Sequence, residues 1–124
     1  MQTILVAEVQ GQHALSDRHL RNAGFHAAYI AEDLEDALYW AEQHQPDLII
    51  AERRLPPAPQ DWELVRRIRA TPGTADIPIL GLLPHGATTT DIGACVRAGC
   101  TEYLVLPAQT AELEAKVRRL LTGA

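Results

Sequence analysis

The sequence is poor in positive charge and has no long apolar run. It has 11 lysine and arginine residues and 16 acidic residues, which gives a formal net charge of -5. Domains that bind nucleic acid normally carry clustered basic side chains, so this balance argues against a nucleic-acid partner. No apolar run approaches the roughly 20 residues that a membrane helix needs. We therefore expect neither a nucleic-acid groove nor a membrane-spanning segment.

Signals for export and for metal binding are also lacking. The N-terminus has no basic segment followed by a long apolar one, so a cytoplasmic location is expected. Cys95 and Cys100 form no Cys-x-x-Cys pair and have no histidine cluster beside them. Two small buried thiols are therefore expected in place of a disulfide or a metal site. Without repeats or a linker, residues 1–124 are predicted to form one domain that carries no output domain.

What the sequence does contain is a fivefold alternation of apolar runs with segments of helical period. The run 47–51 is unbroken, which is typical of a central parallel strand that is buried on both faces. Asp33 and Asp61 are predicted to cap the second and third helices. The expected strands are 3–7, 26–30, 47–51, 77–83 and 102–106. The expected helices are 14–23, 62–70, 88–98 and 109–121, together with a second helix that starts at 34 and ends before Pro46.

This alternation predicts a three-layer, doubly wound α/β fold of the flavodoxin type, with a parallel sheet in the order 2-1-3-4-5. In such folds, chemistry gathers where the carboxyl ends of the strands emerge. Glu52 directly follows the central apolar run and is the first candidate. No serine or cysteine ends a strand beside an activating base, so an enzyme is not expected.

Several motifs along the whole chain together resemble the receiver domains of two-component response regulators, the CheY-like family. This resemblance implies that a partner kinase phosphorylates an aspartate beside bound Mg²⁺, and that the face of the fourth helix, fifth strand and fifth helix then switches. The motifs are Ile4-Leu5-Val6, Pro46-Asp47-Leu48-Ile49-Ile50, Leu55-Pro56, residues 62–69, Ile77-Pro78-Ile79, and residues 98–104 before Pro107.

The residues that the resemblance assigns to this chemistry are nearly all replaced. The metal-binding acidic pair falls on Glu8 and Val9, and the phosphoacceptor falls on Glu52, which is one methylene longer than aspartate. The hydroxyl position falls on Leu83 and the lysine position on Leu106. No side-chain oxygen from Val9 is available to hard Mg²⁺, so no Mg²⁺ cofactor is expected.

The chain therefore resembles a degenerate receiver, a pseudo-receiver that acts through a protein partner or as a homodimer. Tyr103 falls on the family's switch aromatic, and the only lysine, Lys116, lies on the last helix. Lys116, Arg118 and Arg119 are predicted to form a solvated helix face, and so are Arg66, Arg67 and Arg69. The proline-rich loop 56–60 is expected to be stiff and one residue longer than usual.

Two interpretations of Glu52 stay open. It is either a built-in mimic of phosphoaspartate or a polar strand end whose charge needs a partner. Glu8 and Glu52 are expected to face each other, and desolvation with like-charge repulsion then raises one pKa. We hypothesise that Arg54 bridges both carboxylates in place of the lost cation. Its alternative is an arginine that points into solvent.

Two other functions also stay open. One is an unusual but functional phosphoacceptor, and the other is a flavodoxin-like domain that binds a small molecule. Against the second, residues 9–13 lack the run of glycines or hydroxyls that would cradle a phosphate.

Overall fold

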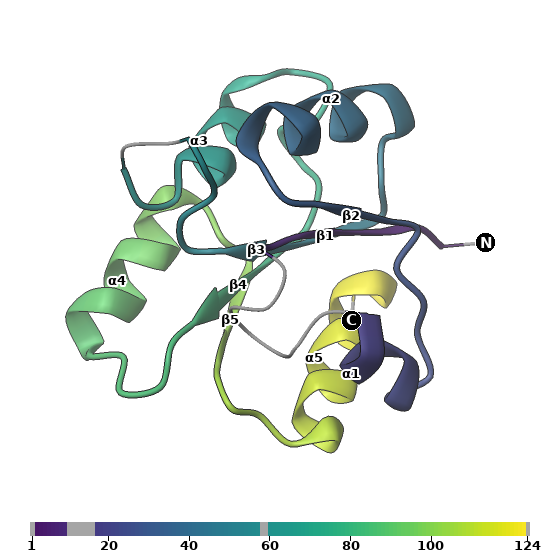
Figure 1. Ribbon diagram of the computed structural model, residues 1–124, viewed down its shortest axis with the longest axis vertical. Helices are drawn as coiled ribbons and strands as arrows, with labels where there is room; N and C mark the ends of the chain where they lie inside the picture. Colours follow the sequence, from purple (N-terminus) through teal and green to yellow (C-terminus); the bar gives the residue numbers. More distant parts are fainter. Residues whose placement is uncertain (1, 10–16, 58–59, 124) are drawn as a thin grey trace.

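The computed structural model describes residues 2–9, 17–57 and 60–123, which form a parallel sheet between two layers of helices (Figure 1). The sheet has five strands in the order β2-β1-β3-β4-β5, and every pairing is parallel. The predicted fold class is confirmed. The elements are β1 (Ile4–Ala7), α1 (Asp17–Asn22), β2 (Tyr29–Ala31), α2 (Leu34–His44), β3 (Leu48–Glu52), α3 (Glu63–Ala70), β4 (Ile79–Leu83), α4 (Thr89–Ala98), β5 (Glu102–Val105) and α5 (Thr110–Thr122).

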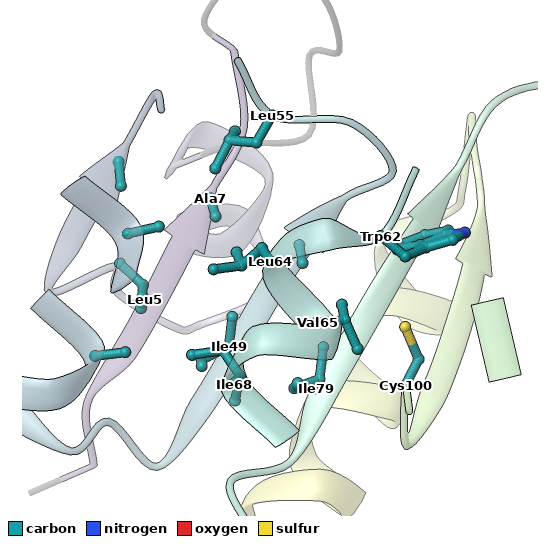
Figure 2. Packing of buried hydrophobic residues seen from close by; sticks show 14 of the residues in the cluster. Leu5, Ala7, Ile49, Leu55, Trp62, Leu64, Val65, Ile68, Ile79 and Cys100 are labelled. Carbon is teal, nitrogen blue, oxygen red and sulfur yellow. The ribbon is translucent and has the colours of Figure 1, made fainter. Parts of the chain in front are cut away.

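Side chains along the buried strands point alternately to the two faces of the sheet, and each face has its own hydrophobic core. In β1, Leu5 and Ala7 belong to the core under α2, α3 and α4, which Figure 2 shows from close by. Ile4 and Val6 belong to the core under α1 and α5. All four side chains are buried. Successive residues of a strand point to opposite faces, so a strand covered on both sides must be apolar throughout.

Some predicted segments lie partly outside the described residues. These are residues 14–16 of the expected first helix, residues 58–59 of the proline-rich loop, and residues 10–13 after the first strand. Within the described ranges, no helix is both long and apolar enough to cross a bilayer.

Capping was predicted correctly for α2 and wrongly for α3. Asp33 accepts a hydrogen bond from the backbone of Asp36 at 2.8 Å, as expected of an N-cap. At α3 the cap is Trp62, whose backbone is left-handed (φ 62°) and whose side chain makes no capping bond. The Trp62 ring is buried against the sheet, and the backbone N–H of Trp62 donates to the Arg53 carbonyl at 2.7 Å. Burial of the indole therefore sets where α3 begins.

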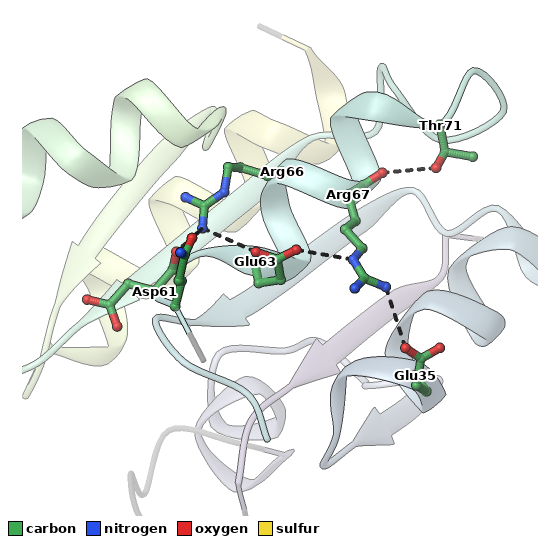
Figure 3. A network of polar contacts seen from close by, with 7 residues as sticks. Glu35, Asp61, Glu63, Arg66, Arg67 and Thr71 are labelled. Carbon is green, nitrogen blue, oxygen red and sulfur yellow. Dashed lines mark hydrogen bonds and ion pairs between the residues drawn. The ribbon is translucent and has the colours of Figure 1, made fainter. Parts of the chain in front are cut away.

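Arginines on α3 tie that helix to its neighbours. Arg67 bridges Glu63 at 3.2 Å and Glu35 of α2 at 3.5 Å (Figure 3). Arg66 donates to the Asp61 carbonyl at 2.7 Å, which fastens the first turn of α3 to the preceding loop. These contacts are mostly exposed, so each contributes little to stability.

Arg69 is different, and its prediction as part of a solvated face is wrong. Its guanidinium donates to the carbonyls of Gly99 at 2.9 Å, Ala75 at 2.8 Å and Ile77 at 2.6 Å. Partial burial lowers its pKa. A Cβ on Gly99, which has φ 121°, would lie 2.8 Å from Arg69 Cγ, so glycine is needed for this close approach. Arg69 thus joins the ends of α3 and α4 to the start of β4.

Replacing Arg69 with alanine should destabilise the protein by about 2–4 kcal/mol, because three carbonyls lose a charged donor. Urea unfolding followed by circular dichroism measures this change. The control is Arg118→Ala, which removes an exposed pair with Glu114 within α5 and a contact with the Phe25 ring and should cost no more than about 1 kcal/mol. Equal effects of the two substitutions would contradict the role given to Arg69.

Candidate functional site

The carboxyl ends of β1 and β3 bring two acidic residues to the same edge of the sheet. Ala7 pairs with Ala51, so the next residues, Glu8 and Glu52, lie on neighbouring strands. Both are buried, with exposed fractions of 1% and 7%. The N–H of Val9 faces the Glu52 carboxylate, at 3.3 and 3.5 Å from its two oxygens. The structure therefore brings together Glu8, Val9 and Glu52 as the sequence predicted.

The ends of β4 and β5 contribute aliphatic side chains to this edge. The backbone N–H of Leu106 donates to the Leu83 carbonyl at 2.9 Å, so the two positions are adjacent. Leu83 is fully buried in the core under α2, α3 and α4. Leu106 is buried in the core on the other face. Neither side chain can donate a hydrogen bond or a positive charge to an anion, and both contribute to packing.

The hypothesis that Arg54 replaces the lost cation does not match its observed ion pair. Nε and Nη2 of Arg54 lie 2.9 and 2.8 Å from one carboxylate oxygen of Asp61, and the Arg54 side chain is 59% exposed. The reasoning assumed that the chain stays extended after Glu52. In fact β3 ends at Glu52 and the backbone bends at Arg53, so two-residue alternation no longer sets the direction of the side chain.

Asp61 also has a different role from the predicted one. Its carboxylate does not cap α3, and it binds Arg54 and lies 3.8 Å from Arg53 Nε. Arg53 and Arg54, which follow β3, therefore both contact the loop that precedes α3.

Tyr103 and Lys116 form a contact that sequence reasoning missed. Lys116 Nζ lies 4.9 Å from the centroid of the Tyr103 ring and donates to the Tyr103 carbonyl at 2.6 Å. It also lies 3.7 Å from Glu102. The prediction of a solvated lysine is therefore wrong, since its side chain is only 18% exposed. The pattern of side chains carried no signal for this contact, because the shortest hydrogen bond of Lys116 goes to a main-chain oxygen.

The oxygen ligands at this edge are few. Among the residues that the structure describes, no group of three or more His, Cys, Asp or Glu side chains could hold a metal ion. Glu8 and Glu52 supply carboxylates, whereas Val9 supplies no side-chain oxygen. Mg²⁺ requires near-ideal octahedral oxygen coordination, and this set of ligands matches that requirement poorly.

The fold and the acidic edge together define a doubly wound parallel α/β domain whose candidate site lies at the carboxyl ends of the central strands. Residues 4–118 match the response regulator receiver domain family. The chain belongs to this family and is a receiver domain of the two-component response regulator type.

Characterised relatives agree with this assignment. The phosphate regulon regulatory protein PhoB of Rhizobium meliloti is 31% identical over 122 residues, which cover 96% of this chain and 52% of PhoB. The cyclic di-GMP phosphodiesterase response regulator RpfG of Xanthomonas campestris is 35% identical over 93 residues, 75% of this chain and 24% of RpfG. The chain thus spans about half or less of these relatives.

Solved structures agree as well. A putative response regulator from Chloroflexus aurantiacus has a TM-score of 0.84 and 31% identity, with 98% of both chains covered. The receiver domain of a sensor histidine kinase from Pseudomonas aeruginosa has a TM-score of 0.83 and 29% identity over 98% of both chains. That neighbour holds a magnesium ion in its active site cleft.

Placing a hydroxyl at position 83, where the family resemblance predicts one, should destabilise the protein. Leu83→Thr removes buried aliphatic volume and places a hydroxyl in the core, so we expect a loss of about 2–4 kcal/mol. The matched control is Val96→Thr on α4, where the side chain is 53% exposed and the change should stay within about 0.5 kcal/mol. Urea unfolding measures both, and a Leu83→Thr protein of unchanged stability would contradict the packing role of Leu83.

Proposed function

We propose that this receiver domain is a pseudo-receiver, which does not accept a phosphoryl group at Glu52 and signals through protein contacts. The observation that carries the proposal is the set of side chains at the strand ends. Glu52 is accompanied by Val9, Leu83 and Leu106, where phosphoryl transfer calls for metal ligands and positive charge to offset the developing negative charge. We further propose that the domain works in the cytoplasm, without Mg²⁺ and without enzymatic activity.

The position of the Glu52 carboxylate supports the proposal. It is buried at the end of β3 and faces the N–H of Val9. In-line attack needs a nucleophile that is held within a small tolerance of the reacting atom, and the longer glutamate side chain shifts its oxygens from the aspartate position. The only lysine of the chain is engaged with Tyr103 and Glu102.

For the signalling contact we propose the face made by α4, β5 and α5, used with a protein partner or a second copy of the chain. An apolar side chain, Val96, is 53% exposed on α4. Charged groups accompany it on β5 and α5, where Glu102 and Arg119 pair at 2.8 Å. An apolar centre with a polar rim is the usual anatomy of a protein interface. The net charge of -5 supports a protein in place of a nucleic acid.

Incubation with acetyl phosphate and Mg²⁺ tests the absence of phosphoryl transfer. We expect the intact mass to stay that of the unmodified chain, because the acceptor lacks the metal ligands and the cation that drive the reaction. Native-condition mass spectrometry at several times of incubation measures this. A phosphoryl adduct that maps to Glu52 would refute the proposal and favour the unusual phosphoacceptor.

A gain-of-function variant supplies the matched control. Val9→Asp, Glu52→Asp and Leu106→Lys introduce the residues that the family resemblance predicts and leave Leu83 unchanged. Because Leu106 is also buried, circular dichroism first checks that the variant folds. We expect this triple variant to gain one phosphoryl group in the presence of Mg²⁺ and to stay unmodified with EDTA. A folded triple variant that remains unmodified would show that the three substitutions do not account for the loss of reactivity.

The proposed contact face is tested by sedimentation velocity over a wide concentration range. We expect self-association of the wild type to be abolished by Val96→Asp, because a charge would be buried in the interface. Tyr39→Asp on α2 is the control, since Tyr39 is 64% exposed on another face. A wild type that stays monomeric restricts the proposal to a heterologous partner, and equal effects of both substitutions would contradict the face.

A further inference from the structure

The two cysteines of the chain meet at one point of the sheet. A Cβ placed on Gly81 of β4 would lie 2.5 Å from Cys95 Sγ and 2.8 Å from Cys100 Sγ. Both sulfurs therefore occupy the space that any larger residue at position 81 would fill. Both cysteines are buried and reduced, as the sequence predicted. Their convergence was not predicted, because five residues separate them and a continuing helix would carry them apart.

The end of α4 explains how they meet. The N–H of Cys100 donates to the carbonyl of Cys95 at 3.3 Å, and the N–H of Gly99 donates to the carbonyl of Val96 at 3.1 Å. With Gly99 at positive φ, this is the pair of bonds that defines a Schellman motif, which brings the first residue after the glycine against the helix residue five positions earlier. The backbone thus places one cysteine over the other.

We propose that Cys95 and Cys100 are a redox-sensitive pair that forms an intramolecular disulfide when the protein meets a peroxide. The residues lie on elements whose backbones already approach each other, so the bond needs little rearrangement of the main chain. A disulfide between these two cysteines closes a short loop, so it stabilises the folded chain only a little through the entropy of the unfolded state. Such a bond is suited to being formed and reduced reversibly. The property is independent of whether Glu52 accepts a phosphoryl group.

The chemistry balances with hydrogen peroxide as the oxidant. The thiolate of one cysteine attacks a peroxide oxygen, which forms a sulfenic acid and releases one water once protons are taken up. The second thiol then attacks the sulfenic sulfur, loses its proton, forms the S–S bond and releases a second water. In total, the two thiols lose two electrons and two protons to form the disulfide, and one peroxide molecule is reduced to two waters.

The surroundings indicate which thiol reacts first. A hydrogen bond from the Cys100 thiol lowers the pKa of Cys95, and burial opposes this effect. The same hydrogen bond, together with burial, raises the pKa of Cys100. The thiolate is the nucleophile, so Cys95 is assigned the attack on peroxide and Cys100 the closure of the disulfide.

Access for the oxidant comes from the packing of α4. Cys95 is the only residue of α4 that is fully buried, whereas Val96 beside it is largely exposed. Ile92, Ala94 and Ala98 are only partly buried against the core, so α4 opens locally more easily than the fully buried central strands. Opening of α4 would expose both sulfurs at once.

Oxidation of the reduced 124-residue chain with hydrogen peroxide tests the proposal, with intact mass, non-reducing electrophoresis and thiol alkylation as readouts. We expect a monomer that has lost two hydrogen atoms, whose two alkylatable thiols fall to none and return with dithiothreitol. The same chain unfolded in urea shows that the oxidant dose is sufficient. A native chain whose thiols stay unreacted at that dose, oxygen added to either cysteine as located by peptide mapping, or disulfide-linked dimers would each overturn the proposal; oxygen added at Met1 is expected of methionine and does not bear on it.

Two single substitutions and one structural readout complete the test. Cys95→Ser and Cys100→Ser should each fail to lose two hydrogens. We expect the Cys100→Ser protein, which keeps Cys95, to be trapped by a sulfenic-acid reagent faster than the Cys95→Ser protein. In the oxidised wild type, amide exchange in the last turn of α4 should slow by about tenfold or more, while α2 stays unchanged. Unaltered exchange in α4 would argue against a bond at this place.

Discussion

The register between β1 and β3 is the constraint on which the candidate site depends. Because Ala7 pairs with Ala51, the residues that follow must emerge side by side, whatever their chemistry. In this chain they are Glu8 and Glu52, both buried. A slip of one residue would turn every side chain of a strand to the other face, so the two cores fix the register and the register fixes the site. The geometry of a receiver is thus maintained by packing, independently of the phosphoryl chemistry.

Under our proposal of a pseudo-receiver, this separation explains how the fold is kept without the reactive groups. Leu83 and Leu106, to which the family resemblance assigns the hydroxyl and lysine positions, each extend one of the two cores. Replacing a polar group at a strand end with a buried aliphatic one removes a desolvation cost and adds apolar contact. Loss of the reactive groups and gain of stability therefore go together at these positions.

The elements and both core faces could be predicted because they follow from periodicity, which a single sequence displays directly. The strand order followed from the handedness of βα crossovers and the usual order of doubly wound sheets. The juxtaposition of Glu8 with Glu52 could be predicted too, since it needs only the strand ends and a parallel sheet. The errors arose where the chain leaves regular structure. Arg54 was placed next to the carboxylates by assuming that the backbone stays extended beyond β3, whereas it pairs with Asp61. Asp61 was predicted to cap α3 because aspartate is a common N-cap, whereas burial of Trp62 decides where α3 starts.

Arg69 and Lys116 were misplaced for a related reason. Long basic side chains bury their stems and carry their charge several ångströms from the helix, so position on a helix does not say what the charge meets. Arg69 reaches carbonyls at the ends of α4 and at the start of β4, and Lys116 reaches the backbone of β5. Both partners are main-chain oxygens, which no pattern of side chains can reveal.

These two basic residues also bear on how the proposed contact face behaves. Lys116 joins α5 to Tyr103 of β5. Lys116 therefore joins two elements of the face, and Arg69 joins the end of α4 to α3 and to the segment before β4, in both cases by charged hydrogen bonds, which are stronger than neutral ones. In a domain with a working phosphoacceptor such bonds would oppose rearrangement of the face. In the pseudo-receiver that we propose, no rearrangement has to be driven. A face whose closed arrangement predominates, with only transient local opening of α4, binds its partner without first having to become ordered.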